Sequence, residues 1–232
     1  MTTRWSANDT EFDVIRQHMK ALQGNVPELD REVTEARKRC DSKNATASDL
    51  YRWSSAVLSR ATDDFDYGRR MDMTSDGKKP MDLFPRLSVP NSYAFTRIRF
   101  LIVSWMEFPN HKMVPLAEAL RRHDPMDRAV TLTLLYLYQP SAPNIYPNDR
   151  AKGEALVKFI DAHFQQSVST WAKTGWFYYT AWMYTKSKAD ATEAIRRYAQ
   201  ARKLTKSAEQ RKFIDKERET MIRGTPGLKV GG

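Results

Sequence analysis

Residues 189–204 have the sequence ADATEAIRRYAQARKL, which carries the clearest helical pattern in the chain. Ala194, Tyr198 and Ala201 follow one another at intervals of four and three residues, so they fall on one face of an α-helix. The small residues let a second helix approach closely, and the tyrosine ring fills the gap beside them. The stretch therefore predicts a helix that packs tightly against a partner helix.

The same spacing occurs 39 residues earlier, at Ala155, Phe159 and Ala162. Helical periodicity also covers most of the remaining chain. It predicts helices over residues 8–23, 27–40, 48–65, 92–108, 113–123, 126–138, 148–165, 168–185, 190–204 and 207–222. Short polar turns join many of them, so we expect antiparallel helix pairs and an all-α fold.

Residues 129–138, AVTLTLLYLY, have a composition that also allows a β-strand. A lone strand among helices would have no partner for its backbone hydrogen bonds. We therefore predict a helix over 126–138, with Asp124 as its cap and Pro125 at its first position.

The helix pairs resemble tetratricopeptide repeats (TPR). The Ala–aromatic–Ala pattern is similar to the second helix of such a repeat, and GWFYYTAWMY is similar to the first, with Trp176 and Tyr179 at matching positions. Thr180 and Met183 stand where the family prefers Gly and Tyr, and the 39-residue separation exceeds the family period of about 34. The resemblance implies helix pairs stacked as a short right-handed solenoid. An irregular α-helical bundle is the alternative.

Prolines and glycines break the helical pattern between residues 67 and 91. Proline removes a backbone donor and turns the preceding residue away from helix, so this stretch is predicted to be irregular. The expected organisation is an N-terminal helical segment (1–66), an irregular connection (67–91), a TPR-like helical domain (92–223, best matched over 169–204) and a flexible tail (224–232).

The composition is that of a globular protein, with 41% hydrophobic and 28% charged residues among 232. The longest apolar run, within residues 100–106, is far shorter than the roughly 20 residues that a membrane span needs. The first 12 residues lack the apolar core of a signal peptide. We expect a soluble, cytoplasmic protein with no membrane span.

Residue types that usually carry catalysis are sparse. The four histidines lie in separate segments without the HExxH spacing of zinc enzymes, and no glycine-rich phosphate loop occurs. The single Cys40 excludes an internal disulfide and falls on the apolar stripe of residues 27–40, which predicts a small core residue.

The nearest approach to a carboxylate cluster is Asp63, Asp64 and Asp66. These residues lack the ligand pattern of a calcium loop and are predicted to form a solvated helix end, with the helix stopping near Ala61. We expect no catalytic residue, no cofactor and no metal. An enzyme of unrecognised type is the third functional hypothesis.

The net charge of +10 is concentrated near the C-terminus. Residues 1–70 contain 12 basic and 12 acidic residues, residues 71–185 contain 13 and 10, and residues 186–232 contain 13 and 6. A local positive field attracts nucleic acid, anionic lipid or an acidic protein segment.

Half of the residues from 171 to 184 are aromatic. On a helix, four of them cluster on one side, namely Trp171, Tyr178, Tyr179 and Trp182, and three on the other, namely Trp176, Phe177 and Tyr184. One side can pack on the paired helix, while the other is either covered by a neighbouring unit or exposed.

The leading hypothesis is a protein–protein interaction module or scaffold that binds an extended acidic and apolar peptide, because the resemblance implies that first helices line a concave binding face. The predicted binding residues are Trp171, Trp176, Tyr178, Trp182, Arg196, Arg197, Arg202 and Lys203. The alternative is RNA or DNA binding through the basic C-terminal helices, the last of which is predicted to cap the array. The oligomeric state stays open.

Overall fold

The computed structural model describes residues 10–42, 45–63, 92–106, 113–139 and 149–228. All regular structure in these ranges is helical, which confirms the predicted all-α class. The ten helices within them are α1 (Thr10–Ala21), α2 (Val26–Cys40), α3 (Ala47–Asp63), α5 (Tyr93–Met106), α6 (Val114–His123), α7 (Arg128–Leu137), α8 (Arg150–His163), α9 (Val168–Thr185), α10 (Lys188–Leu204) and α11 (Ala208–Gly224). The stretch that also allowed a strand forms α7, so the helical prediction is confirmed. None of these helices is both long enough and apolar enough to cross a membrane.

The chain divides into two compact units, Met1–Val130 and Thr131–Gly232. The sequence predicts a boundary at residues 67–91, and that connection lies outside the described residues. The division falls in α7 instead, because α5 packs against α1 and α3 and so belongs with the N-terminal helices.

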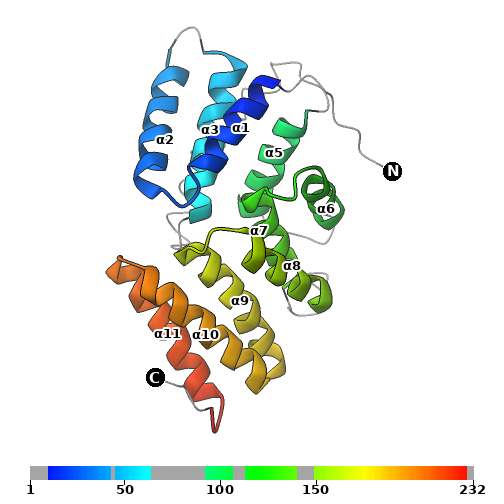
Figure 1. Cartoon of the computed structure of the whole chain (residues 1–232), viewed down its shortest axis with the longest axis vertical. Coiled ribbons are helices and arrows are strands. Elements are labelled where there is room, and N and C mark those ends of the chain that lie inside the picture. Colours follow the sequence, from blue (N-terminus) through cyan, green and yellow to red (C-terminus); the bar gives the residue numbers. More distant parts are fainter. Residues whose placement is uncertain (1–9, 43–44, 64–91, 107–112, 140–148, 229–232) are drawn as a thin grey trace. The chain divides into compact units, whose positions relative to one another are not determined.

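Helix α3 is the centre of the first unit, where it packs against α1, α2 and α5 (Figure 1). Its buried residues include Leu50, Trp53, Val57 and Ala61, as the helical period predicts. Burial of such a stripe supplies most of the stability of a surface helix.

Cys40 packs beside a small apolar cluster formed by Ala36, Trp53 and Val57. Burial, together with the charges of nearby aspartates, raises the pKa of the Cys40 thiol to about 11. Because the thiolate is the reactive form, this thiol is a poor nucleophile at neutral pH. Cys40 is only partly buried at the edge of this cluster, so the prediction of a small core residue is confirmed in part.

Several helices begin at residues other than the predicted ones, and α8 is capped by Asp149, one residue after its predicted start at 148. The Thr46 hydroxyl caps α3, two residues before the predicted start at 48, since it accepts from the Asp49 N–H at 3.2 Å while the Asp49 carboxylate accepts from the Thr46 N–H at 2.9 Å. Asp127 caps α7 in place of Asp124, and accepts from a backbone N–H of the first turn at 3.2 Å. Asp124 instead follows α6 as its C-terminal cap.

In the second unit, α10 lies between α9 and α11, and the three helices run side by side (Figure 1). Ala194, Tyr198 and Ala201 are fully buried, as their spacing predicts. Gly175 of α9 permits the close approach to α10, because a Cβ at this position would lie 3.2 Å from the Tyr198 ring.

The earlier copy of the pattern is oriented differently. Ala155 and Ala162 are exposed and Phe159 is half-buried. Helix α8 instead buries the face that carries Gly153, since the ring of Phe177 from α9 lies directly against this glycine. The repeated spacing in the sequence therefore does not correspond to a repeated buried face.

Replacing Gly153 with valine should destabilise the second unit by about 1–3 kcal/mol in denaturant unfolding. A Cβ at this position would clash with the Phe177 ring, which is fully buried. Combining it with Phe177→Leu should recover part of the loss, because the smaller side chain leaves room for the added atoms. A loss that Phe177→Leu does not reduce would refute the clash as its cause.

The segment after α11 differs from the expected flexible tail as far as residue 228. The Trp182 indole Nε1 donates to the buried Thr225 hydroxyl at 2.8 Å, and Lys188 Nζ donates to the Gly227 carbonyl at 2.7 Å. These contacts hold residues 225–227 against α9 and α10. Residues 229–232 of the predicted tail lie outside the described part of the chain.

Candidate functional site

The aromatic helix α9 carries Trp171 and Tyr178 on the side where they meet two arginines of α10. The Arg196 guanidinium lies 5.7 Å from the centre of the Trp171 ring. The Arg197 guanidinium lies 5.5 Å from Trp171 and 5.4 Å from Tyr178. These are cation–π distances. The structure thus brings together four of the residues that the sequence predicts as a binding site.

Arg197 is an interior residue, with only 3% of its surface exposed. Its guanidinium donates to Asp161 at 2.7 and 2.9 Å, to Glu193 at 2.8 Å and to Thr174 at 2.9 Å. These bonds join α8, α9 and α10. The prediction that Arg197 contacts a partner is therefore corrected, because its donors are already used inside the unit.

The other predicted basic residues lie on the surface of α10. Arg196 is half-exposed and donates to Glu193 at 2.8 and 2.7 Å, and Arg202 donates to Asp215 of α11 at 2.7 Å. Their charges are thus largely balanced by neighbouring carboxylates. Lys203 is exposed and has no ion pair with any described residue.

Trp176 and Trp182 face away from this arginine pair, with Tyr179 between them. The Tyr179 ring centre lies 5.1 Å from that of Trp176 and 5.7 Å from that of Trp182. Trp176 is half-buried, whereas Trp182 is 3% exposed and hydrogen-bonded to Thr225. Trp182 is therefore a core residue, in contrast to its predicted binding role, because the end of α11 covers it.

Four lysines at the end of α10 and along α11 keep their charge without a carboxylate partner. Lys203, Lys206, Lys212 and Lys216 are exposed and form no ion pair within the described ranges. The sequence identifies the basic C-terminal region, but of these four only Lys203 is among the predicted binding residues. The signal that could have found the others is the excess of basic over acidic residues in the last fifth of the chain.

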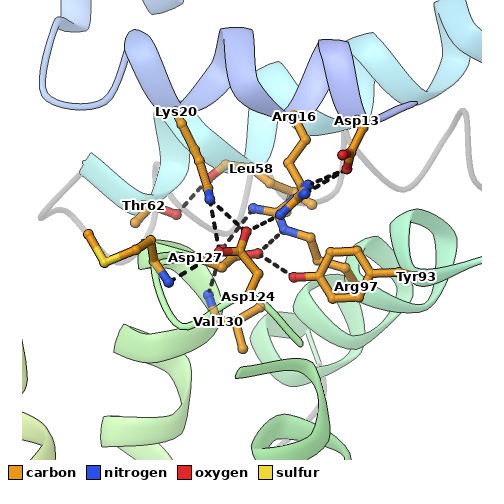
Figure 2. A network of polar contacts seen from close by, with 11 residues as sticks. Asp13, Arg16, Lys20, Leu58, Thr62, Tyr93, Arg97, Asp124, Asp127 and Val130 are labelled. Atoms are coloured by element: carbon orange, nitrogen blue, oxygen red, sulfur yellow. Dashed lines mark hydrogen bonds and ion pairs between the residues drawn. The ribbon is translucent and has the colours of Figure 1, made fainter. Parts of the chain in front are cut away.

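A second polar cluster lies in the first unit, at the corner between α6 and α7 (Figure 2). Asp124 pairs with Arg16 and Lys20 of α1, and Lys20 Nζ lies 2.7 Å from its Oδ2 atom. The backbone N–H of Met126 donates to the same carboxylate at 3.1 Å. The carboxylate of Asp124 therefore fastens α1 to this corner.

Asp127, at the same corner, is 1% exposed. Its carboxylate accepts two hydrogen bonds from Arg97, one of them at 3.1 Å, and one from the Tyr93 hydroxyl at 3.2 Å. Burial alone would raise the pKa of Asp127, but the charge and hydrogen bonds of Arg97 outweigh it and hold this pKa below its ordinary value. Asp127 is thus ionised and paired.

Asp63 is buried, which corrects the prediction of a solvated helix end. It pairs with Arg128, and its carboxylate accepts from the Gly24 N–H at 2.9 Å. Because these donors compensate the charge, α3 continues to Asp63 and does not stop two residues earlier. Asp64 and Asp66 lie outside the described residues.

Each buried charge of the first unit named above has a partner of opposite sign, so the cluster is balanced and leaves no free acid, base or nucleophile. In the described part of the chain, no group of three or more His, Cys, Asp and Glu side chains could hold a metal ion. The cluster acts in packing the helices. Sequence reasoning missed it because its partners are distant: Asp124 lies 108 positions after Arg16.

Comparison of the chain with models of protein families, with curated protein sequences and with solved structures finds no match.

The first unit should lose stability as the pH falls below about 4, the ordinary carboxyl range. Because the pKa of Asp127 is lowered by folding, its ionisation stabilises the fold above that range, and the contribution disappears as pH falls through the folded pKa. Urea unfolding between pH 5 and pH 3 measures this loss. Without Arg97 the pKa is no longer held down, so the Arg97→Met variant should show a shallower decline. Parallel declines would contradict the assignment.

Proposed function

We propose that the second unit is a protein-interaction module, of the TPR-like kind that the sequence resembles, which binds an extended segment with acidic and apolar residues. The observation that carries this proposal is the contrast between paired arginines and unpaired lysines. Arg196 and Arg202 are matched by carboxylates of their own unit, whereas Lys203, Lys212 and Lys216 have no carboxylate partner among the residues that the structure describes. Unbalanced surface charge of one sign attracts a partner of the other.

Partly exposed apolar side chains on the same helices would contact the apolar residues of the segment. Leu204 is 47% exposed and directly follows Lys203, and Ile222 on α11 is 38% exposed. Trp171 and Tyr178 add half-buried rings on α9. Large aromatic residues of this kind contribute much of the binding energy at protein interfaces.

A peptide explains this surface better than a nucleic acid does. Glu209 lies between Lys206 and Lys212 in the sequence, Glu219 follows Lys216, and the partly exposed Leu204 and Phe213 lie among the lysines. A nucleic-acid surface is usually a continuous basic patch, because each phosphate needs a cation. The mixed character instead suits a chain in which carboxylates alternate with apolar residues.

The test uses a short labelled peptide in which Glu alternates with Leu and Phe, a matched peptide with Gln at each Glu, and a single-stranded RNA. Fluorescence anisotropy with the full chain should give at least about tenfold tighter binding for the Glu peptide than for the Gln peptide, decreasing with added salt. Equal binding of the two peptides would contradict the proposal. Tighter binding of the RNA would support the nucleic-acid alternative in its place.

A further inference from the structure

Glu217 of α11 is a buried carboxylate with an unsatisfied oxygen. The residue is 9% exposed, and its Oε2 atom has no hydrogen-bond partner among the described residues. Buried polar atoms are nearly always hydrogen-bonded, and a buried carboxylate nearly always has a cationic partner. An unsatisfied one in a native fold therefore requires an explanation.

The other strongly buried carboxylate among the described residues of this unit is fully paired. Asp190 is 1% exposed and accepts from Arg150 at 2.7 and 2.9 Å. Glu217 has no such partner within the described ranges, although the region around it is strongly basic. Within the described ranges, Glu217 therefore lacks the cationic partner that Asp190 has.

The surroundings of Glu217 are aromatic. Burial and the hydrogen bond to Glu217 raise the pKa of Tyr179, which places the Tyr179 hydroxyl beside this carboxylate. The Tyr179 ring is stacked on Trp176, with ring planes inclined by 29°. Trp182 is the other ring beside Tyr179, and Lys186 Nζ lies 4.5 Å from the centre of the Trp182 ring. A cation of the protein thus already lies against Trp182, while Trp176 remains half-exposed.

We propose that Trp176, Tyr179 and Glu217 form a site for an arginine side chain of the bound segment. A guanidinium is planar and weakly hydrated, so it can stack on the Trp176 ring while its N–H groups donate to the Glu217 carboxylate, which turns toward the ligand. This inference rests on the proposed function, because the arginine belongs to the segment that the second unit is proposed to bind. The acidic residues of the segment would contact the lysines, and its arginine would contact this site.

The probe is Nα-acetyl-arginine amide, with Nα-acetyl-citrulline amide as its uncharged analogue. In ¹H–¹⁵N spectra of the full chain, the indole N–H signal of Trp176 should shift in a saturable way with the arginine amide and remain unchanged with the citrulline amide. Glu217→Gln keeps the side-chain shape but removes the charge, and it should weaken the binding by about tenfold or more.

An equal shift with citrulline amide, or undiminished binding to folded Glu217→Gln, would overturn the proposal. If Glu217→Gln fails to fold, Trp176→Leu replaces it, with the indole N–H of Trp182 as the signal, and undiminished binding again overturns the site. Because these probes contain no acidic residue, their result is independent of the peptide test. If the arginine amide does not bind, the proposed binding of acidic residues to the lysines still stands. If the Glu peptide does not bind, binding of the arginine amide can still be measured.

Discussion

Arg97→Met should lower the free energy of unfolding of the first unit by about 3–5 kcal/mol. Arg97 is 6% exposed and Asp127 is 1% exposed, and the two form a doubly hydrogen-bonded ion pair. Removing the cation leaves the Asp127 carboxylate buried, with the Tyr93 hydroxyl and one backbone N–H as its donors in the described part of the chain. Urea unfolding at neutral pH, followed by circular dichroism, measures the loss.

Two variants show whether the loss comes from the buried charge. Adding Asp127→Asn to Arg97→Met removes the unpaired carboxylate, so the double variant should be more stable than the single one. Arg31→Met breaks an exposed pair with Glu28 on α2 and should change stability by less than about 1 kcal/mol. An Arg97→Met variant as stable as Arg31→Met would show that the buried pair does not hold the helices.

The consecutive arginines of α10 should lose very different amounts of stability on the same substitution. Arg197→Met should cost about 2–4 kcal/mol, because Asp161 and Thr174 lose the guanidinium that donates to them and Glu193 is left with Arg196. Arg196→Met should cost less than about 1 kcal/mol, because this side chain is half-exposed and its ion pair with Glu193 lies at the surface. Both variants keep the methylene stem and remove the same charge.

Denaturant unfolding monitored by tryptophan fluorescence compares the two variants directly. Trp171 lies against both guanidinium groups, so its emission reports on each substitution. Similar losses for the two arginines, or a larger loss for Arg196→Met, would contradict the interior role assigned to Arg197.

The helices could be predicted from the sequence because their signals are local. The spacing of Ala194, Tyr198 and Ala201 depends only on the helical period, and all three are buried as expected. The cap of α7 could not be predicted, since the choice between Asp124 and Asp127 depends on arginines from distant helices. Local capping preferences allow either aspartate, and contacts with distant helices determine which of them caps α7.

The candidate site could be predicted from the sequence less well than the helices. Arg196 and Arg197 are chemically identical, and the 100° rotation between neighbouring helix positions turns one outward and the other inward. Whether an arginine is free depends on carboxylates such as Asp161 and Asp215, which lie on other helices. The charge excess could therefore be located in the C-terminal fifth, but the side chains that carry it could not be identified.

In the proposed function, the unpaired lysines, and not the paired arginines, attract an acidic partner. The direct measurement compares the affinity of the same Glu-containing peptide for two triple variants with equal loss of charge. One carries glutamine at Lys203, Lys212 and Lys216, and the other carries glutamine at the ion-paired Arg196, Arg202 and Arg223. We expect the lysine variant to lose about tenfold or more in affinity and the arginine variant to lose about threefold or less. Equal losses, or a larger loss in the arginine variant, would contradict the claim.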